Sequence, residues 1–384
     1  MLFMIDQGVV DIFTSASATP RDIAGLDYIA LGVAEGSHRL IGSRAGLLAL
    51  ARCNMLQQKS RDVFMRAYNR MGTEGVLLKK LKIYGIVIAN TTMVDPVSTI
   101  SGEKRVISFP LRWFDASKKI QSTLLLGEDL YDVDVLIKIG EAGTVLANIG
   151  YLPLKHDEDH GGGGSTARVL NSNVIKERLC VCVVDSDRAC PSGTMGNTAL
   201  AVQPFKNQAN FPLVGVIETT GRDLENMLPD TFYRTEYGHH RQYGRMVMVF
   251  EALTQRNETD LRAHIDVEKG VTLHQIFRHA TGSPETLFWN TKIGLLFAIL
   301  GGSQPTTVAC HVNGRCTQAS NSLCPGCVVI QGNNDNILER FATRYANVSR
   351  HTLCKCLDNS TTVEWTRIGE NIAAWCCGDD KLRL

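Results

Sequence analysis

The chain has 384 residues, of which 44% are hydrophobic and 21% are charged, and its formal net charge is +1. This length and composition are typical of a soluble globular protein with two or three domains, each with its own core. A net charge so close to zero excludes a general attraction to nucleic acid. Any nucleic-acid surface must therefore be a local patch or be bridged by metal ions.

The expected compartment is the cytoplasm. No apolar run reaches the roughly 18 residues that a membrane-spanning helix needs, so no membrane association is expected. The first residues lack the basic segment of a secretion signal and soon reach an acid, Asp6. In the cytoplasm, twelve cysteines predict thiols or metal ligands rather than a disulfide framework.

Residues 1–90 are expected to form a small α/β unit, with helix-forming composition at 45–55 and 62–71. The apolar run 2–5 ends at Asp6. A strand that ends on an aspartate resembles the opening of a PIN-like nuclease domain, and a helical scaffold with a surface aspartate is the alternative. Residues 91–120 contain prolines and turn formers and are expected to be a linker, with Trp113 and Phe114 packing under the next domain.

Residues 121–230 alternate between strand and helix patterns. We expect strands at 124–128, 179–184 and 212–217 and helices at 131–149 and 169–176, with a glycine-rich turn at 161–164. Short connections between such elements predict a Rossmann-like parallel sheet with right-handed crossovers. Residues 231–384 are expected to be a mainly helical, cysteine-rich region. Its expected helices lie at 261–279, 287–300 and 337–346, and residues 245–252 fit a strand or a buried helix.

Acidic residues follow two of the expected strands. Asp185 and Asp187 come directly after the strand 179–184, and their spacing turns both side chains to the same side of an extended chain. Glu128 ends the strand 124–128, and Asp132 lies one helical turn later on the same face. Parallel strands bring their carboxyl ends to one edge of a sheet. Because four carboxylates there repel each other unless cations are bound, the sequence predicts a Mg²⁺ or Mn²⁺ site.

Each acid also has a purely structural explanation that stays open. Asp185 and Asp187 could cap the turn that follows the strand. Glu128 and Glu225 could be acids in the first turn of a helix, favoured by the helix dipole. Asp132 could lie on a solvated helix face.

The order of these features resembles a TOPRIM domain, the metal-binding fold of topoisomerases, bacterial primases and OLD-family nucleases. Glu128 with Asp132 is similar to the glutamate and second acid of OLD-type and related phage-defence nucleases. The run 161–165 is similar to their glycine-rich turn, and Glu225-Asn226 to the Glu-Asn pair after their fourth strand. The resemblance covers less than a third of the chain.

The resemblance implies a Mg²⁺- or Mn²⁺-dependent endonuclease of antiviral defence that cleaves phosphodiester bonds. Glu128, Asp185 and Asp187 would be catalytic and would bind the metals, with Glu128 holding one metal or acting as general base. Asp132 and Glu225 would complete the shell of a second metal ion.

The chain also departs from this family. Asp129 follows the glutamate where many relatives have glycine, and no Gly-x-Ser-x-Glu pattern stands near Asp187. For the lysine of OLD nucleases only Lys206 is a candidate. Because no Walker A pattern is present, an ATPase that the activity required would be a separate partner subunit. Assembly into a homo-oligomer stays open.

Two further segments carry candidate sites. The spacing of Cys310, Cys316, Cys324 and Cys327 is compatible with a structural Zn²⁺ site, although the first pair is wider than in a common zinc knuckle, and unliganded thiols are the alternative. The densest local basic patch supplies candidate nucleic-acid contacts, with a solvated loop as the alternative. These contacts are His239, His240, Arg241 and Arg245, to which Lys206 is added.

Two other functions fit the same pattern. A topoisomerase-like DNA strand-breaking enzyme combines TOPRIM with a tyrosine nucleophile, for which Tyr68 and Tyr84 are the upstream candidates. A sensor subunit that binds metal or nucleic acid without catalysis is the other.

Overall fold

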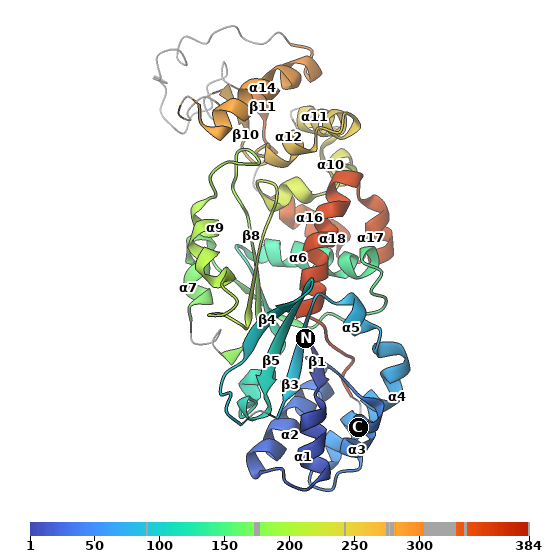
Figure 1. The fold of residues 1–384 in the computed structure, drawn as a ribbon. Coiled ribbons are helices and arrows are strands. Elements are labelled where there is room, and N and C mark those ends of the chain that lie inside the picture. Colours follow the sequence, from blue (N-terminus) through green and yellow to red (C-terminus); the bar gives the residue numbers. More distant parts are fainter. Residues whose placement is uncertain are drawn as a thin grey trace. The chain divides into compact units, whose positions relative to one another are not determined.

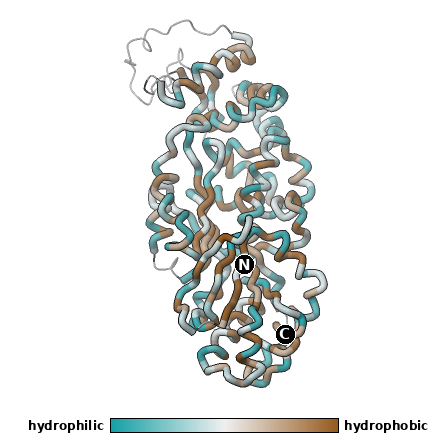
Figure 2. Tube along the Cα trace, in the orientation of Figure 1, coloured by the Kyte–Doolittle hydropathy of each residue, from teal (hydrophilic) through white to brown (hydrophobic). Residues whose placement is uncertain are grey.

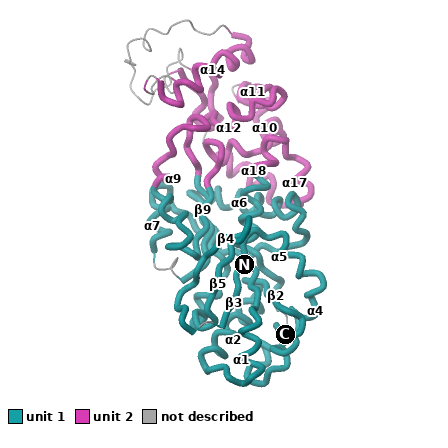
Figure 3. The backbone as a smooth tube through the Cα atoms, viewed as in Figure 1, with its two compact units in different colours: residues 1–184, 201–217, 365–384 teal, residues 185–200, 218–364 magenta. Residues whose placement is uncertain are grey.

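A computed structural model describes residues 1–89, 91–172, 177–241, 243–273, 276, 280, 282–302, 328–333 and 336–382. These residues form two compact units, which Figure 3 shows in different colours. Unit 1 comprises residues 1–184, 201–217 and 365–384, and unit 2 comprises residues 185–200 and 218–364. None of the described helices is long and apolar enough to cross a bilayer.

The first sheet of unit 1 is built by the start of the chain (Figure 1). Its strands are β1 (Leu2–Ile5), β2 (Arg39–Gly42), β3 (Ile83–Ile88), β4 (Val97–Ser101) and β5 (Lys104–Pro110), in the order β2-β1-β3-β5-β4. All neighbouring pairs are parallel except β4 with β5. The helices that precede β3 are α1 (Gln7–Thr14), α2 (Pro20–Ala34), α3 (Arg44–Ala51), α4 (Gln58–Glu74) and α5 (Leu77–Lys80). The predicted α/β character is confirmed.

The segment 91–120, which we expected to be a linker, contributes β4, β5 and the short 3-10 helices η1 (Leu111–Trp113) and η2 (Ser117–Ile120) to unit 1. Strand β4 is polar and exposed, as edge strands commonly are, so it carries no hydrophobic alternation. Phe114, expected to pack under the next domain, instead packs edge-on against Phe3, with ring centroids 5.6 Å apart. Trp113 packs on Phe109 at 5.4 Å.

The second sheet of unit 1 contains the strands that we expected to carry the acids. Its strands are β6 (Thr123–Gly127), β7 (His156–His160), β8 (Cys180–Val184) and β9 (Val214–Glu218), in the order β7-β6-β8-β9. Strand β6 pairs in parallel with both β7 and β8, and the parallel pairing of β6 with β8 was predicted. Strands β6 and β8 are wholly buried, and Figure 2 shows hydrophobic residues along the interior strands. Strand β7 was not predicted because its five residues are charged or His and largely exposed.

Helices connect these strands, and the last helix of the chain packs against the first of them. The connecting elements are α6 (Leu130–Leu146), η3 (Gly163–Ser165), α7 (Thr166–Leu170), α9 (Asn197–Val202) and η4 (Gln203–Lys206). Helix α6 meets α18 (Asn359–Trp375) where a Cβ atom added to Gly143 would lie 2.4 Å from the carbonyl carbon of Gly369. The hydroxyl of Thr123 donates to the carbonyl of Trp375 at 2.6 Å, which ties α18 to β6 as well.

Unit 2 is mainly helical, in agreement with the expectation for the C-terminal region. Its elements include η5 (Leu224–Met227), α10 (Asp230–Tyr237), α11 (Gly244–Gln255), α12 (Thr259–His264), β10 (Gly270–Thr272), α14 (Pro284–Ile299), β11 (Val328–Gln331), α16 (Ile337–Tyr345) and α17 (Arg350–Cys356). The helix expected over 261–279 is interrupted, because α12 ends at His264, after which Ile265 is extended. Residues 270–272 instead form β10, which pairs with β11 in antiparallel fashion. Residues 274, 275 and 277–279 lie outside the described residues.

Candidate functional site

Glu128 and Asp132 lie together where β6 leads into α6. The carboxylate Oδ2 of Asp132 accepts the backbone N–H of Glu128 at 2.9 Å and that of Asp129 at 2.8 Å. The side chain of Asp129 accepts the N–H of Tyr131 at 3.0 Å, and the two aspartates form a capping box. Burial raises the pKa of Asp132 to about 6, against the lowering effect of the hydrogen bond from Asp129. Asp132 therefore fixes the backbone that presents the half-buried Glu128.

Asp185, Ser186 and Asp187 form a turn directly after β8. The N–H of Ser186 donates to the hydroxyl of Thr219 at 2.9 Å, and the N–H of Asp187 donates to the carbonyl of Arg222 at 2.8 Å. Asp187 has φ +55°, a left-handed conformation in which Asp and Asn are enriched. Ser186 is fully buried, whereas Asp185 is half-buried and Asp187 is exposed. The turn is thus held in place through the buried Ser186, while the side chains of Asp185 and Asp187 are more exposed.

Arg222 forms ion pairs with two aspartates next to this turn. Its Nε lies 3.1 Å from Oδ2 of Asp223, and its Nη2 lies 2.9 Å from Oδ2 of Asp266. Burial opposes the charge of Arg222, but the carboxylates of Asp223, Asp266 and Asp187 outweigh it and raise the pKa of Arg222. Burial raises the pKa of Asp223 to about 7, although Arg222 pulls it down. Sequence reasoning missed this cluster, for which the only local signal was an Arg-Asp pair after β9.

Gly196 packs against the carboxylate of Asp187. A Cβ atom at Gly196 would lie 2.0 Å from Oδ2 of Asp187, so a larger residue would displace that side chain. The N–H of Gly196 donates to the carbonyl of Ser186 at 2.9 Å. Residues 185–200 therefore fold back onto the acidic turn.

The same loop is held to α14 by Glu285. Oε1 of Glu285 accepts both the N–H and the hydroxyl of Thr194, each at 3.0 Å. Burial raises the pKa of Glu285, but the hydrogen bonds from the backbone and hydroxyl of Thr194 and from its own N–H lower it to about 2. An ionised Glu285 thus stabilises the loop that follows Asp187.

Replacing Glu285 by glutamine is expected to lower the free energy of unfolding by about 1–3 kcal/mol at pH 7, because hydrogen bonds to a charged group are lost. The pKa of Glu285 is depressed in the folded chain, so its contribution is present above the unfolded value of 4.5 and is lost as pH falls toward about 2. Chemical denaturation of both proteins at pH 7 and pH 3 measures this. A difference between the proteins that stays constant with pH would contradict the assignment, and Thr194→Val provides the second arm of a double-mutant cycle.

Glu225, predicted as a metal ligand, lies in η5 and is 6% exposed. Its carbonyl accepts the hydroxyl of Tyr233 at 2.7 Å, and burial together with the Glu225 carboxylate raises the pKa of Tyr233 well above its usual range. The neighbouring Asn226 donates to the carbonyls of Arg262 and Ile265 at 3.0 and 2.8 Å. The Glu-Asn pair is thus part of the packed interior of unit 2.

The predicted nucleic-acid contacts are exposed side chains on two segments. Four of them belong to unit 2 and lie between α10 and α11 or in the first turn of α11. They are His239, His240, Arg241 and Arg245. The ring of His240 stacks on that of Tyr243, with centroids 4.3 Å apart, which leaves a flat ring surface among the cations. Lys206 ends η4 in unit 1.

The candidate metal ligands are carboxylates in the described residues and cysteines outside them. Within the described ranges, no three His, Cys, Asp or Glu side chains are grouped so that they could hold a metal ion. The predicted zinc ligands Cys310, Cys316, Cys324 and Cys327 lie outside the described residues. The predicted acidic ligands supply only carboxylate oxygens. These are the hard donors that Mg²⁺ and Mn²⁺ prefer, so the donor chemistry fits either ion.

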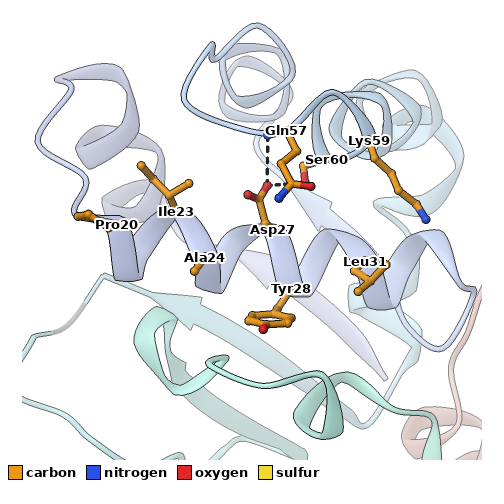
Figure 4. A pocket seen from close by; sticks show the side chains of 9 residues that line it. All are labelled: Pro20, Ile23, Ala24, Asp27, Tyr28, Leu31, Gln57, Lys59 and Ser60. Atoms are coloured by element: carbon orange, nitrogen blue, oxygen red, sulfur yellow. Dashed lines mark hydrogen bonds between the residues drawn. The ribbon is translucent and has the colours of Figure 1, made fainter.

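A groove of about 440 Å³ runs along α2, away from all of these residues in the sequence (Figure 4). Ile23, Tyr28 and Leu31 contribute to its wall. Asp27 accepts the N–H of Gln57 at 3.4 Å and the hydroxyl of Ser60 at 2.5 Å. These bonds tie α2 to the start of α4, and no predicted site residue lines the groove.

A scan against protein-family models gives no match for this chain, and searches of curated proteins and of solved structures give none either.

Proposed function

We propose that this chain is a Mg²⁺- or Mn²⁺-dependent nuclease with a TOPRIM-like arrangement of acids, acting in antiviral defence. The observation that supports this most is the parallel pairing of β6 with β8, in which Leu126 lies opposite Cys182. In this register Glu128 and Val184 are both two residues further on, and Asp185 follows Val184 directly. A glutamate and an Asp-x-Asp turn thus follow the carboxyl ends of neighbouring parallel strands, where α/β sheets bind their ligands.

Glu128, Asp185 and Asp187 are the residues that would hold the divalent cation. A bound cation of this kind stabilises the negative charge that develops on the phosphoryl oxygens. Glu128 is also our candidate for taking the proton of the attacking water, because a half-buried carboxylate is a suitable general base. Asp132 acts on Glu128 through the backbone bonds of the capping box and is a positioning residue.

The exposed basic segment after α10 is our candidate for contacting the nucleic-acid backbone. Arg241 and Arg245 supply charge, and the stacked rings of His240 and Tyr243 supply a surface for a base. An ATPase that the activity requires would be a separate subunit, since the chain has no Walker A pattern.

The proposal is tested by incubating the purified protein with plasmid, single-stranded DNA and total RNA. We expect cleavage of at least one substrate in Mg²⁺ or Mn²⁺ and none in EDTA. Cleavage that persists in EDTA would contradict metal dependence, and intact substrates in every condition would contradict the nuclease proposal. A protein–DNA adduct that survives denaturation and vanishes in Tyr84→Phe would favour the strand-breaking alternative.

A further inference from the structure

The first sheet of unit 1 has an open edge at β4. Within the described part of the chain, β4 has β5 on one side and no strand on the other. The opposite edge of the sheet, β2, is mostly buried. Four of the five residues of β4 are exposed, and Val97 and Ile100 are 46% and 62% exposed. An exposed edge strand of this kind is a template for pairing with another strand.

The pairing of β4 with β5 shows which backbone groups face the open edge. A two-residue turn at 102–103 joins the two strands, and the residues that flank such a turn form a hydrogen-bonded pair. In agreement with this, the N–H of Arg105 donates to the carbonyl of Lys82 at 2.8 Å, on the side of β5 away from β4. Because hydrogen-bonded and non-hydrogen-bonded pairs alternate, Ser98 and Ile100 direct their N–H and C=O groups toward the open edge.

Strand β4 lacks the features that commonly protect an edge. Charged side chains, prolines, bulges or a covering segment usually prevent such a strand from pairing. The sequence of β4, Val-Ser-Thr-Ile-Ser, contains no charge and no proline, and its register with β5 has no bulge. The hydroxyl of Ser98 accepts the Nε–H of Arg105 at 3.0 Å, but this bond uses the side chain and leaves the outward backbone groups available.

A second copy of β4 fits this edge in antiparallel orientation about a two-fold axis. Pro96, which has no N–H, limits the ladder on one side, and the turn at 102–103 limits it on the other, so the free edge is centred on Thr99. With the axis at Thr99, Ser98 of each chain lies opposite Ile100 of the second copy. Each of these pairs exchanges both of its N–H···O=C bonds.

The side chains that meet in this register are compatible. Thr99 lies opposite Thr99 of the second copy, and such Thr–Thr pairs are favourable in sheets. Val97 lies opposite Ser101 of the second copy on the same face, and no like charges meet along the strand. A second copy therefore supplies both the backbone groups and the uncharged side chains that the edge accepts.

We propose that two copies of this chain associate by antiparallel pairing of β4 with β4 about Thr99, which joins their five-stranded sheets into one continuous sheet. Two strands of five residues bury less surface than a standard interface, so the dimer is reversible, with a dissociation constant of about 1–100 µM. The inference goes beyond the nuclease proposal and does not depend on it, because β4 carries none of the proposed metal ligands.

The test is sedimentation velocity of the full-length protein over concentrations that span about 1–100 µM, where we expect a monomer–dimer equilibrium. Thr99→Lys and Thr99→Glu should each weaken association by at least about tenfold, because like charges then lie directly opposite each other. An equimolar mixture of the two variants should regain association, because opposite charges then face each other. Thr99 is exposed, so both variants should fold normally.

Thr14→Lys on α1 is the matched control, because it makes the same substitution at an exposed position outside the hairpin. It should associate like the unmodified protein. Loss of structure cannot produce the expected pattern, because misfolded variants would not regain association when mixed. A protein that stays monomeric at every concentration would overturn the proposal. Association that both Thr99 variants retain would place the interface elsewhere, and a mixture that associates no better than either variant would overturn the pairing about Thr99.

Discussion

Replacing Asp185 and Asp187 together by asparagine is expected to abolish metal-dependent cleavage while leaving the fold intact. The loss should exceed the roughly 10–100-fold that removal of an outer-shell partner of a metal ligand costs, because both residues would contact the cation directly. Asparagine keeps the shape of the side chain and tolerates the left-handed backbone of Asp187. The turn should therefore survive, and only the charge should be lost. Initial cleavage rates in Mg²⁺ and in Mn²⁺ measure the effect.

The matched control for this variant is Asp260→Asn on α12, which removes one exposed carboxylate from the same unit. It should cleave at the rate of the unmodified protein. Circular dichroism and the midpoint of thermal unfolding should be similar for all three proteins. If the double variant keeps its cleavage rate, or its toxicity in cells, the acids are not catalytic and the non-catalytic sensor becomes the better reading.

Replacing Gly143 by alanine is expected to destabilise unit 1 strongly. The new Cβ atom would lie 2.4 Å from the carbonyl carbon of Gly369 and 2.5 Å from its Cα, and both are backbone atoms that can move only with α18. Overpacking of this kind typically costs about 1–3 kcal/mol. For a unit of the size of unit 1 we expect the midpoint of thermal unfolding to fall by several degrees, at roughly 2–4 °C per kcal/mol.

Gly72→Ala in α4 is the matched control. Gly72 is also helical and belongs to the same unit, but a Cβ atom there would have no atom within 4 Å. Both substitutions gain up to about 1 kcal/mol of helix propensity, so their difference isolates the contact between α6 and α18. Equal stabilisation by both alanines would show that the two helices do not approach this closely.

The central strands could be predicted because their sequences are continuous apolar runs that end on acids. β6 and β8 are wholly buried, and burial on both faces leaves a strong signal in the sequence. β7 could not be predicted, because an exposed edge strand needs no apolar side chains. The charged residues of β7 are typical of a turn. The hairpin of β4 and β5 could not be predicted for the same reason, because its edge strand β4 is exposed.

The surroundings of the acids could not be predicted from the sequence. The turn at Asp185 and Asp187 followed from the strand that precedes it. Arg222 and Asp266 form an ion pair although they are far apart in the sequence. No local sequence pattern predicts such a contact. The helix face that Asp132 shares with Glu128 predicts a metal ligand at Asp132. Asp132 also lies three residues after Asp129, which is the spacing of a capping box, so the pattern alone could not separate the two roles.

The course of the chain between the two units has a consequence for how the protein is made. The backbone passes from one unit to the other after residues 184, 200, 217 and 364, so neither unit is a continuous segment. Unit 1 receives its last helical turns only when residues 365–375 have been synthesised, and these carry Gly369 and Trp375 against α6 and β6. During translation the contacts of Gly369 with α6 and of Trp375 with β6 can form only after residue 375 has been synthesised. A fragment cut at residue 230 would lack both contacts.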